Sequence, residues 1–369
     1  MENLVIRRKC DGYEYEKIYE HISNILDELK FGEMYEFKGK SVLIKPNLVA
    51  PMEPEKAVTT HPNIVRAVVE YLVKHGADHI GIGDSGLQTD DRIYEMTGMN
   101  KVAQEFGCKI CKFDKYEIET CNNENNKVLK YVPLSKYVVD ADIIIDIPKL
   151  KIHHAYIYTG AIKNLFGTVP GGNKLNLHAA AGKNSRFEEI LVDIYQTVKP
   201  TICILDGIVG LEGNGPCNGT PVKSNLLLAS YNGLALDIVA CETIGINYTE
   251  VVYLKKFVQR MNNGIEKNIV IHGDEVGVTK YNRPNLIYGK MPVLFEIVAP
   301  LLHKIIKPVP KFDSEKCIKC GICIRTCPVK ALSLNGYPKV DRKKCISCFC
   351  CQEACRSDAI NRSDAINRK

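Results

Sequence analysis

Apolar runs alternate along the chain with segments in which apolar residues recur every three or four positions. The runs occupy residues 41–49, 79–86, 141–148, 201–209 and 225–232, and the helical spacing is found in residues 14–29, 62–75, 186–199 and 236–245. Strands that are apolar on both faces and alternate with helices are typical of a parallel sheet covered on both sides. We therefore predict an α/β fold with a mostly parallel sheet for residues 1–290.

The pattern changes after residue 290. Residues 291–311 contain four prolines and an amphipathic middle, which predicts a connector packed on the main domain. From Phe312 onwards cysteine and lysine dominate, so we place a second, small domain at 312–369. It ends in a repeat, RSDAIN at 356–361 and again at 362–367, whose second copy we interpret as a solvated tail.

The small domain contains two copies of the spacing C-x2-C-x2-C-x3-C, in CIKCGICIRTCP and CISCFCCQEACR. Three closely spaced thiolates can hold three irons of a cubane, and the fourth cysteine of each run ligates the other cluster. Zinc needs four thiolates per site and does not explain the paired fourth cysteines. We expect two 4Fe-4S clusters. The first would take Cys317, Cys320, Cys323 and Cys355, and the second Cys345, Cys348, Cys351 and Cys327.

Residues 312–360 resemble the bacterial-type two-cluster ferredoxins, with CPVKAL and CRSDAI as corresponding parts of two halves. The resemblance implies a small α+β domain that relays single electrons and docks a redox protein partner. The sequence departs from the pattern at Arg356, which stands where the first half has Pro328. Cys350 could compete with its neighbour as a ligand, and we favour Cys351 because it reproduces the register of the first motif.

The net charge of +6 is concentrated in residues 303–369. Because two clusters would subtract charge there, the basic tail favours an acidic protein partner over nucleic acid. No apolar stretch reaches the ~18–20 residues of a membrane span. The first residues also lack the apolar stretch of a signal peptide, so we expect a cytoplasmic protein.

Polar residues gather at the ends of the predicted strands. Ligands of parallel α/β sheets bind beyond the carboxyl ends of the strands, so we expect these residues to face one crevice. The richest segment is KLKIHHAYIYTGAIKNLFG, which follows the run ADIIIDIP. The set comprises Lys45, Asn47, Asp84, Lys149, Lys151, His153, His154, Lys163, Asp206 and Glu212.

The residue types of this set predict a small anionic ligand. Its four lysines are expected to hold the anionic groups. Protons would come from His153 or His154, with Asp84 as the alternative. Asn47, Asp206 and Glu212 are expected to contact the same ligand. GIGDSG also matches G-x-G-x-x-G, but no helix clearly begins there, and the position where a dinucleotide site expects an acidic residue is Gln104, followed only by Glu105.

Residues 1–290 resemble the prokaryotic family called domain of unknown function 362. The resemblance rests on VLIKPNLV, THPNIVRAVVEYLVKHGA, IGDSG, ADIIIDIPKLKIHHAYIYTGAIKNLFG and DGIVGLEGNGPCNGTP with LALDIVA. Members of that family commonly carry an attached ferredoxin domain. The order of parts also resembles the N-terminal domain of nickel-pincer lactate racemase, with His153, Gly160 and Lys163 at its His, Gly and cofactor-lysine positions.

Three functions remain open from the sequence. The favoured one is an oxidoreductase that passes electrons from a low-potential carrier to a ligand in the crevice. The alternatives are a non-catalytic electron-transfer or cofactor-assembly partner and a redox-neutral, racemase-like enzyme with structural clusters. A second organic or metal cofactor in the α/β domain is left unassigned.

Overall fold

A computed structural model describes residues 3–86, 92–182, 186–283 and 308–362. Residues 291–307 of the predicted connector, and the second RSDAIN copy after Arg362, lie outside the described residues. The main domain is built on one sheet with the strand order β12-β1-β11-β10-β7-β2-β3-β4, to which β8 and β9 are attached. The sheet is mixed, but its central strands are parallel. The predicted fold class, an α/β fold with a mostly parallel sheet, is therefore confirmed.

The five predicted apolar runs form the middle of this sheet: β2 (Ser41–Pro46), β3 (His79–Asp84), β7 (Ile143–Ile147), β10 (Ile202–Glu212) and β11 (Thr220–Ser230). β2 pairs in parallel with both β3 and β7, and β7 with β10. β11 runs antiparallel to β10 and to β1 (Leu4–Lys9). The remaining strands of the sheet are β4 (Lys109–Lys112), β8 (Lys149–His153), β9 (Ile157–Thr159) and β12 (Val270–Gly273).

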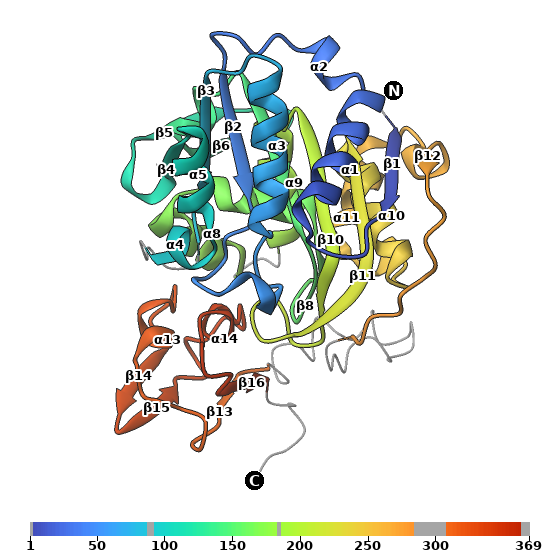
Figure 1. Cartoon of the computed structure of the whole chain (residues 1–369). Coiled ribbons are helices and arrows are strands. Elements are labelled where there is room, and N and C mark those ends of the chain that lie inside the picture. The colour runs from blue at the N-terminus through green and yellow to red at the C-terminus, as the bar shows by residue number, and fades with distance from the viewer. Residues whose placement is uncertain (1–2, 87–91, 183–185, 284–307, 363–369) are drawn as a thin grey trace.

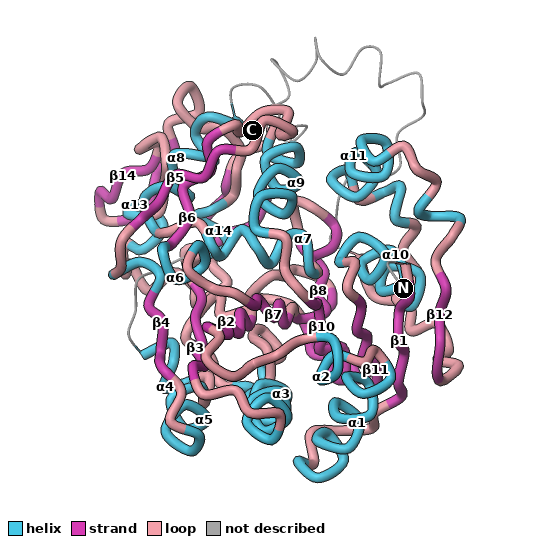
Figure 2. Tube along the Cα trace, turned by 90° about the horizontal axis from the view of Figure 1, so that it is seen from above, coloured by secondary structure: helices cyan, strands magenta, loops and turns pink. Residues whose placement is uncertain are grey.

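Helices cover both faces of the sheet, as Figures 1 and 2 show from two directions. One face packs against α1 (Tyr15–Glu28), α3 (Pro62–Lys74) and α5 (Met99–Phe106), and the other against α7 (Ala161–Asn164), α9 (Phe187–Val198), α10 (Gly233–Thr243) and α11 (Val252–Met261). The predicted helical segments thus coincide with α1, α3, α9 and α10. Burial of two apolar layers explains why the central strands are apolar on both faces.

The polar segment after β7 is largely buried. β8 pairs with β10 and then turns back antiparallel as β9, so that Lys151 faces Thr159 in the register. α7 and a 3-10 turn, η3 (Leu165–Thr168), follow, and then α8 (Gly171–Gly182). The lysines and histidines of this segment therefore lie on a β-hairpin and a short helix at the carboxyl ends of the sheet's strands.

The C-terminal domain pairs β13 (Pro310–Phe312) with β16 (Ile360–Arg362) and β14 (Leu332–Asn335) with β15 (Tyr337–Val340). Its short helices are α13 (Ile322–Arg325) and α14 (Cys350–Glu353). The backbone repeats itself: Lys319, Gly321 and Lys330 are left-handed in the first half, and Ser347, Phe349 and Asp358 at the matching positions of the second. This repetition is that of a two-half ferredoxin-like unit.

The C-terminal domain lies beneath α4 (Arg92–Met96) and α8, on the side toward which β8 points (Figure 1). Asn218 Nδ2 donates to Cys355 O over 3.2 Å, and the His154 ring meets the Phe349 ring edge-on at 5.9 Å. Among the described helices, none is long and apolar enough to cross a membrane.

Candidate active site between the two domains

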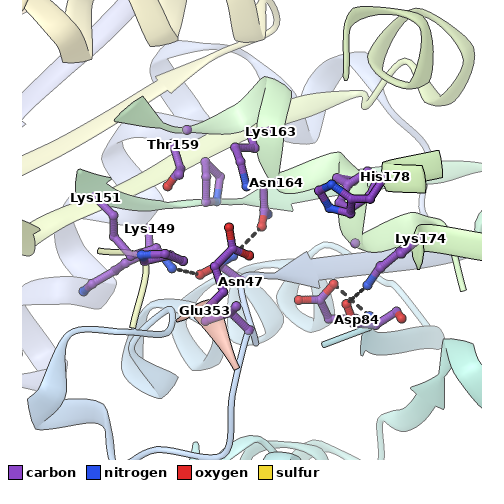
Figure 3. Close-up of a pocket in the computed structure, with 17 residues that line it drawn as sticks. Asn47, Asp84, Lys149, Lys151, Thr159, Lys163, Asn164, Lys174, His178 and Glu353 are labelled. Carbon is purple, nitrogen blue, oxygen red and sulfur yellow. Dashed lines mark hydrogen bonds between the residues drawn. The ribbon is translucent and has the colours of Figure 1, made fainter. Parts of the chain in front are cut away.

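A cavity with a free volume of about 70 Å³ lies at the carboxyl ends of the central strands, and we call it the inner cavity. Lys163 and Glu353 approach it from opposite sides, one from the α/β domain and one from the C-terminal domain (Figure 3). It is lined by Asn47, Val49, Asp84, Ser85, Pro148, Lys149, Lys151, Thr159, Gly160, Lys163, Asn164, Phe166, Gly167, Lys174, His178, Pro216 and Glu353.

Two of the predicted lysines form buried ion pairs. Lys45 Nζ lies 2.8 Å from Asp84 Oδ1, and Leu48 N donates to the other carboxylate oxygen over 2.7 Å. Lys149 Nζ lies 2.8 Å from Asp206 Oδ2, whose Oδ1 accepts the Tyr13 hydroxyl at 2.6 Å. A buried charge is tolerated only when it is paired and hydrogen-bonded, so these four groups hold the strand ends together.

Lys151 and Lys174 differ, because neutral oxygens accept their hydrogen bonds. Lys151 Nζ donates to Asn47 Oδ1 at 2.6 Å and to Val58 O at 2.8 Å. Lys174 Nζ donates to the carbonyl oxygens of Ser85 and Gly86. Burial lowers the pKa of Lys151 to about 7 and that of Lys174 to about 8. Both amines can therefore exchange a proton near neutral pH.

Lys163 is placed by the start of α7. Asp237 accepts hydrogen bonds from Ala161 N at 2.7 Å, Ile162 N at 3.1 Å and the Tyr158 hydroxyl at 3.0 Å, which fixes the first turn of this short helix. The Lys163 ammonium lies 5.5 Å from the centre of the Tyr156 ring. Within the described part of the chain no hydrogen-bond acceptor for Lys163 is found, so its cation is available to an anion in the cavity.

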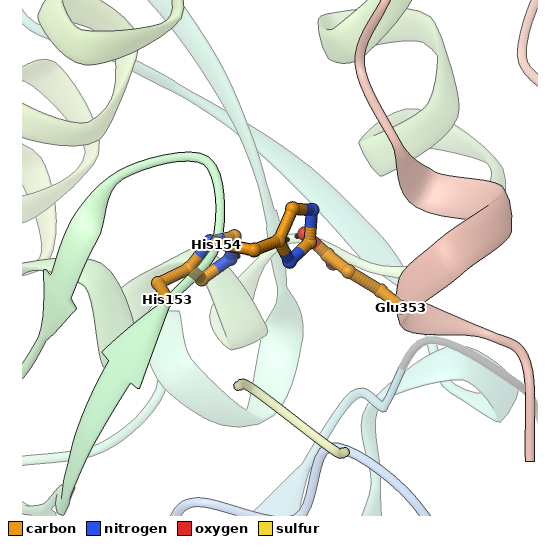
Figure 4. Close-up of side chains that lie close together, drawn as sticks. All are labelled: His153, His154 and Glu353. Carbon is orange, nitrogen blue, oxygen red and sulfur yellow. Dashed lines mark ion pairs between the residues drawn. The ribbon is translucent and has the colours of Figure 1, made fainter. Parts of the chain in front are cut away.

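His153 and His154 form a buried group with Glu353 of α14 (Figure 4). His153 Nδ1 accepts the Ala155 N–H at 3.0 Å, so the neutral ring carries its proton on Nε2, which lies 3.1 Å from Glu353 Oε1. His154 Nδ1 lies 2.9 Å from Gly215 O and therefore carries its proton there. Burial lowers the pKa of His153 well below its ordinary value, which keeps this ring neutral.

The ligand atoms of this group lie within 4.8 Å of one another, which is close enough for a metal ion. A metal-bound imidazole needs a lone pair on the ligating nitrogen and usually donates its other N–H. His153 has the opposite arrangement, since its Nδ1 is an acceptor. The orientation of the His153 ring favours a close polar contact with Glu353 between the domains over a metal site.

The structure brings together most of the predicted site residues. Lys45 reaches the inner cavity only through its partner Asp84, and Asp206 only through Lys149. His153 and His154 lie behind Glu353 and are not among the described residues that line the cavity. Glu212 lies at the end of β10, where its carboxylate accepts the Asn282 N–H at 2.7 Å.

The polar lining residues outside the predicted set include Asn164, Lys174, His178 and Glu353. Asn164 stands in the segment that was singled out, beside Lys163, and donates to buried Asp146 over 2.7 Å. Lys174 and His178 share one face of α8 because they are four positions apart in a helix. Nothing in the sequence indicated a site role for Glu353, because a single carboxylate between cluster cysteines is expected to be an exposed surface residue.

The cysteines of the C-terminal domain form two groups. Burial raises the pKa of Cys323 to about 11, and the neighbouring thiols that raise it further are Cys355, Cys320 and Cys317. Burial also raises the pKa of Cys351, and the neighbouring thiols that add most to it are Cys348, Cys345 and Cys327. Each group thus includes one cysteine from the other half of the domain, Cys355 in the first and Cys327 in the second.

The sulfur atoms are also surrounded as cluster ligands are. Ala331 N donates to Cys327 Sγ at 3.2 Å, and at the matching position Ala359 N donates to Cys355 Sγ at 3.4 Å. N–H groups directed at sulfur stabilise thiolates in iron–sulfur sites. The residues present therefore fit iron–sulfur clusters. Cys350 lines a cavity at the domain boundary, and its thiol is hydrogen-bonded to that of Cys348, a member of the second group.

The fold and the cysteines define an α/β domain joined to a 4Fe-4S binding domain, that is, an iron–sulfur protein. Residues 42–242 match the family described as domain of unknown function (DUF362), and residues 310–333 match the 4Fe-4S binding domain. The chain belongs to the DUF362 family, as its sequence predicts.

A thylakoid-associated protein of Synechocystis sp. is 35% identical to the chain over 243 residues, which cover 65% of this chain and 74% of that protein. Among solved structures, the lactate racemase apoprotein from Thermoanaerobacterium thermosaccharolyticum is 12% identical with a TM-score of 0.42. That match covers 68% of this chain and 58% of the racemase chain. So distant a likeness carries no argument about chemistry.

Proposed function

We propose that the protein is an oxidoreductase with two 4Fe-4S clusters, which takes electrons from a redox protein partner and delivers them to a small anionic ligand in the inner cavity. One observation carries this proposal: α14 contains both Cys351, a proposed cluster ligand, and Glu353, which lines the cavity opposite Lys163. The same short helix thus carries a proposed cluster ligand and forms part of the wall of the ligand cavity.

The proposed ligands of the clusters are the two groups of thiols described above. Clusters of this type supply electrons one at a time over a wide range of potentials. The match to the 4Fe-4S binding domain covers the first motif, and the repeated backbone and the N–H···S contacts support the second.

The α/β domain would bind the ligand and supply protons. Lys163 holds its anionic group, because no acceptor within the described residues competes for this ammonium. Lys151 and Lys174 are the proposed proton donors, since both line the cavity and titrate near neutrality. Asp84 stays paired with Lys45, which makes it a positioning residue. His153, His154 and Glu353 hold the C-terminal domain over the cavity.

The test uses the whole chain, purified without oxygen. Two clusters predict about eight irons per chain. Anions that co-purify are identified by mass spectrometry and added back to protein whose clusters have been reduced with dithionite. We expect the recovered ligand to reoxidise the clusters in the native protein and not in Lys163→Ala. Lys255→Ala, on the exposed side of α11, is the matched control.

Two results would reject the proposal. An iron content near four per chain would remove the second cluster. Equal reoxidation in Lys163→Ala and in the control would remove the inner cavity from the electron path. Reduced clusters that react only with a second redox protein would instead identify an electron carrier.

A further inference from the structure

A second, larger cavity of about 520 Å³ lies where the two domains meet, and we call it the outer chamber. α8 and residues near α4 form one wall, and α13 and α14 of the C-terminal domain form the other. The lining residues are Gly86, Arg92, Asp114, Phe166, Gly171, Gly172, Lys174, Leu175, His178, Ile322, Arg325, Thr326, Cys350 and Arg356. This volume lies within the range of small-molecule sites.

The outer chamber and the inner cavity are neighbours, because Phe166, Lys174 and His178 line both. Lys174 and Phe166 thus stand at the boundary between the two cavities. The inner cavity alone, at about 70 Å³, holds only a few atoms. The reacting end of a larger molecule would fit there.

His178 is the buried polar group at this boundary. Its side chain is held by stacking on Phe187, with ring centres 4.2 Å apart, and by an edge contact with Phe166 at 5.3 Å. The residue is only 6% exposed, yet within the described residues no hydrogen bond to its ring is found. A buried imidazole whose polar atoms line two cavities is placed to bond a ligand that passes between them.

The lining of the outer chamber is strongly basic. Three arginines and Lys174 face it, against the single carboxylate of Asp114. That carboxylate is already engaged, because its Oδ1 accepts the Gly171 N–H at 2.6 Å. Arg325 is exposed on α13, and its one hydrogen bond found among the described residues is a 3.5 Å contact to Cys320 O. Its guanidinium is therefore available to an anion.

We propose that the ligand is an elongated molecule with two anionic groups, one bound by Lys163 in the inner cavity and the other by Arg325 in the outer chamber. The C-terminal domain thereby supplies a substrate-binding residue in addition to its clusters. The inference rests on the proposed function, because it assumes that the end of the ligand in the inner cavity is the end that receives electrons. Carboxylate and phosphate groups share the required chemistry.

The test compares probes of equal length by calorimetry on the cluster-loaded whole chain without oxygen. The probes are linear dicarboxylates of four to seven carbons, monocarboxylates of the same carbon number, and linear diphosphonates of matching chain length. We expect at least one dicarboxylate or diphosphonate to bind about tenfold more tightly than the monocarboxylate of its length, because a second charge-assisted contact contributes that much. A preference that only the diphosphonates show would identify phosphate as the anionic group.

Variants assign the second contact. Arg325→Gln should abolish the dicarboxylate advantage while leaving monocarboxylate affinity and iron content unchanged. Arg342→Gln, an exposed arginine of the same domain outside the outer chamber, should leave both affinities as they are. The inference is overturned if no dicarboxylate is preferred, or if Arg325→Gln weakens both probes equally.

The experiments distinguish a failure of the two-anion inference from a failure of the proposed function. A ligand that reoxidises the reduced clusters without any dicarboxylate preference would overturn the two-anion inference and leave the oxidoreductase intact. A dicarboxylate preference that depends on Arg325, together with clusters that no ligand reoxidises, would support the binding site and reject electron transfer to it.

Discussion

Two kinds of lysine surround the inner cavity, and their partners decide what each can do. Lys45 and Lys149 face carboxylates and form buried ion pairs, and the attraction of Asp206 partly offsets the burial that lowers the pKa of Lys149. Lys151 and Lys174 face neutral oxygens, so burial is not offset and their pKa values fall toward neutrality. The sequence identified three of these four lysines but gave no way to divide them, because the division depends on which side chains meet in space.

Anion binding in the inner cavity should weaken as the pH rises. Lys151 loses its proton near pH 7 and Lys174 near pH 8, and each loss removes a positive charge from the lining. After burial, the groups that act most on Lys151 are Cys217 and Asp84, which raise its pKa, and Lys163 and Lys149, which lower it. Sulfate is a suitable probe, because its own charge is constant over this range.

We expect the affinity for sulfate to fall about tenfold between roughly pH 6 and roughly pH 9, with Lys151→Met removing the lower step. Calorimetry on the cluster-loaded protein measures this. A pH-independent affinity in the native protein would contradict the assignment of these two lysines to the cavity.

The start of α7 is the element that positions Lys163, and Asp237 of α10 holds it. Asp237→Ala would leave two backbone N–H groups and the Tyr158 hydroxyl buried without an acceptor. We expect a loss of about 2–4 kcal/mol in the free energy of unfolding. Asp237→Asn keeps one acceptor oxygen and should lose less. Urea unfolding of the cluster-loaded protein distinguishes the two variants, and equal stability of all three proteins would disprove the anchoring role.

Gly167 permits η3 to pass directly over the Lys45–Asp84 pair. A Cβ there would lie 2.1 Å from Asp84 Oδ1 and 2.8 Å from Lys45 Nζ. Gly167→Ala should therefore displace the pair, lower the free energy of unfolding by about 2–3 kcal/mol and weaken sulfate binding. Gly172→Ala is the matched control, since a Cβ at that position meets nothing within 4 Å. Similar melting temperatures for both variants would show that a Cβ at residue 167 does not displace the Lys45–Asp84 pair.

At the scale of the whole molecule, the C-terminal domain completes a site that the α/β domain begins. Burial alone would raise the pKa of Glu353, but the N–H of the His153 ring and the positive charge of Lys163 hold it well below its ordinary range. Glu353→Lys would place a cation against Lys163 and should separate the domains. Hydrogen exchange across residues 149–163 should become faster in this variant and stay unchanged in Glu315→Lys, an exposed control. Equal protection in the two variants would show that Glu353 does not hold the interface.

Much of this protein follows from local sequence. The apolar runs predicted the central strands, because a strand buried on both faces must be apolar throughout. The cysteine spacing predicted an iron–sulfur domain, because a cubane imposes its own geometry on the loop that binds it. The edge strands β4 and β12, and β1 beside β12, were missed. Both edge strands have only four residues, and β12 is exposed along its whole length, so neither shows the long buried apolar run of a central strand.

The tertiary structure alone decided which of these residues act together. Glu353, Lys174 and Arg325 are unremarkable charges in the sequence. The fold of the α/β domain brings Lys174 to the inner cavity beside Lys163, and the packing of the C-terminal domain adds Glu353 there and Arg325 in the outer chamber. His153 was an obvious candidate for proton transfer, yet its ring nitrogens are directed at a backbone amide and at Glu353. Sequence fixes periodicity and motif spacing, which are local. Charge pairing and cavity walls depend on contacts between residues far apart in the chain.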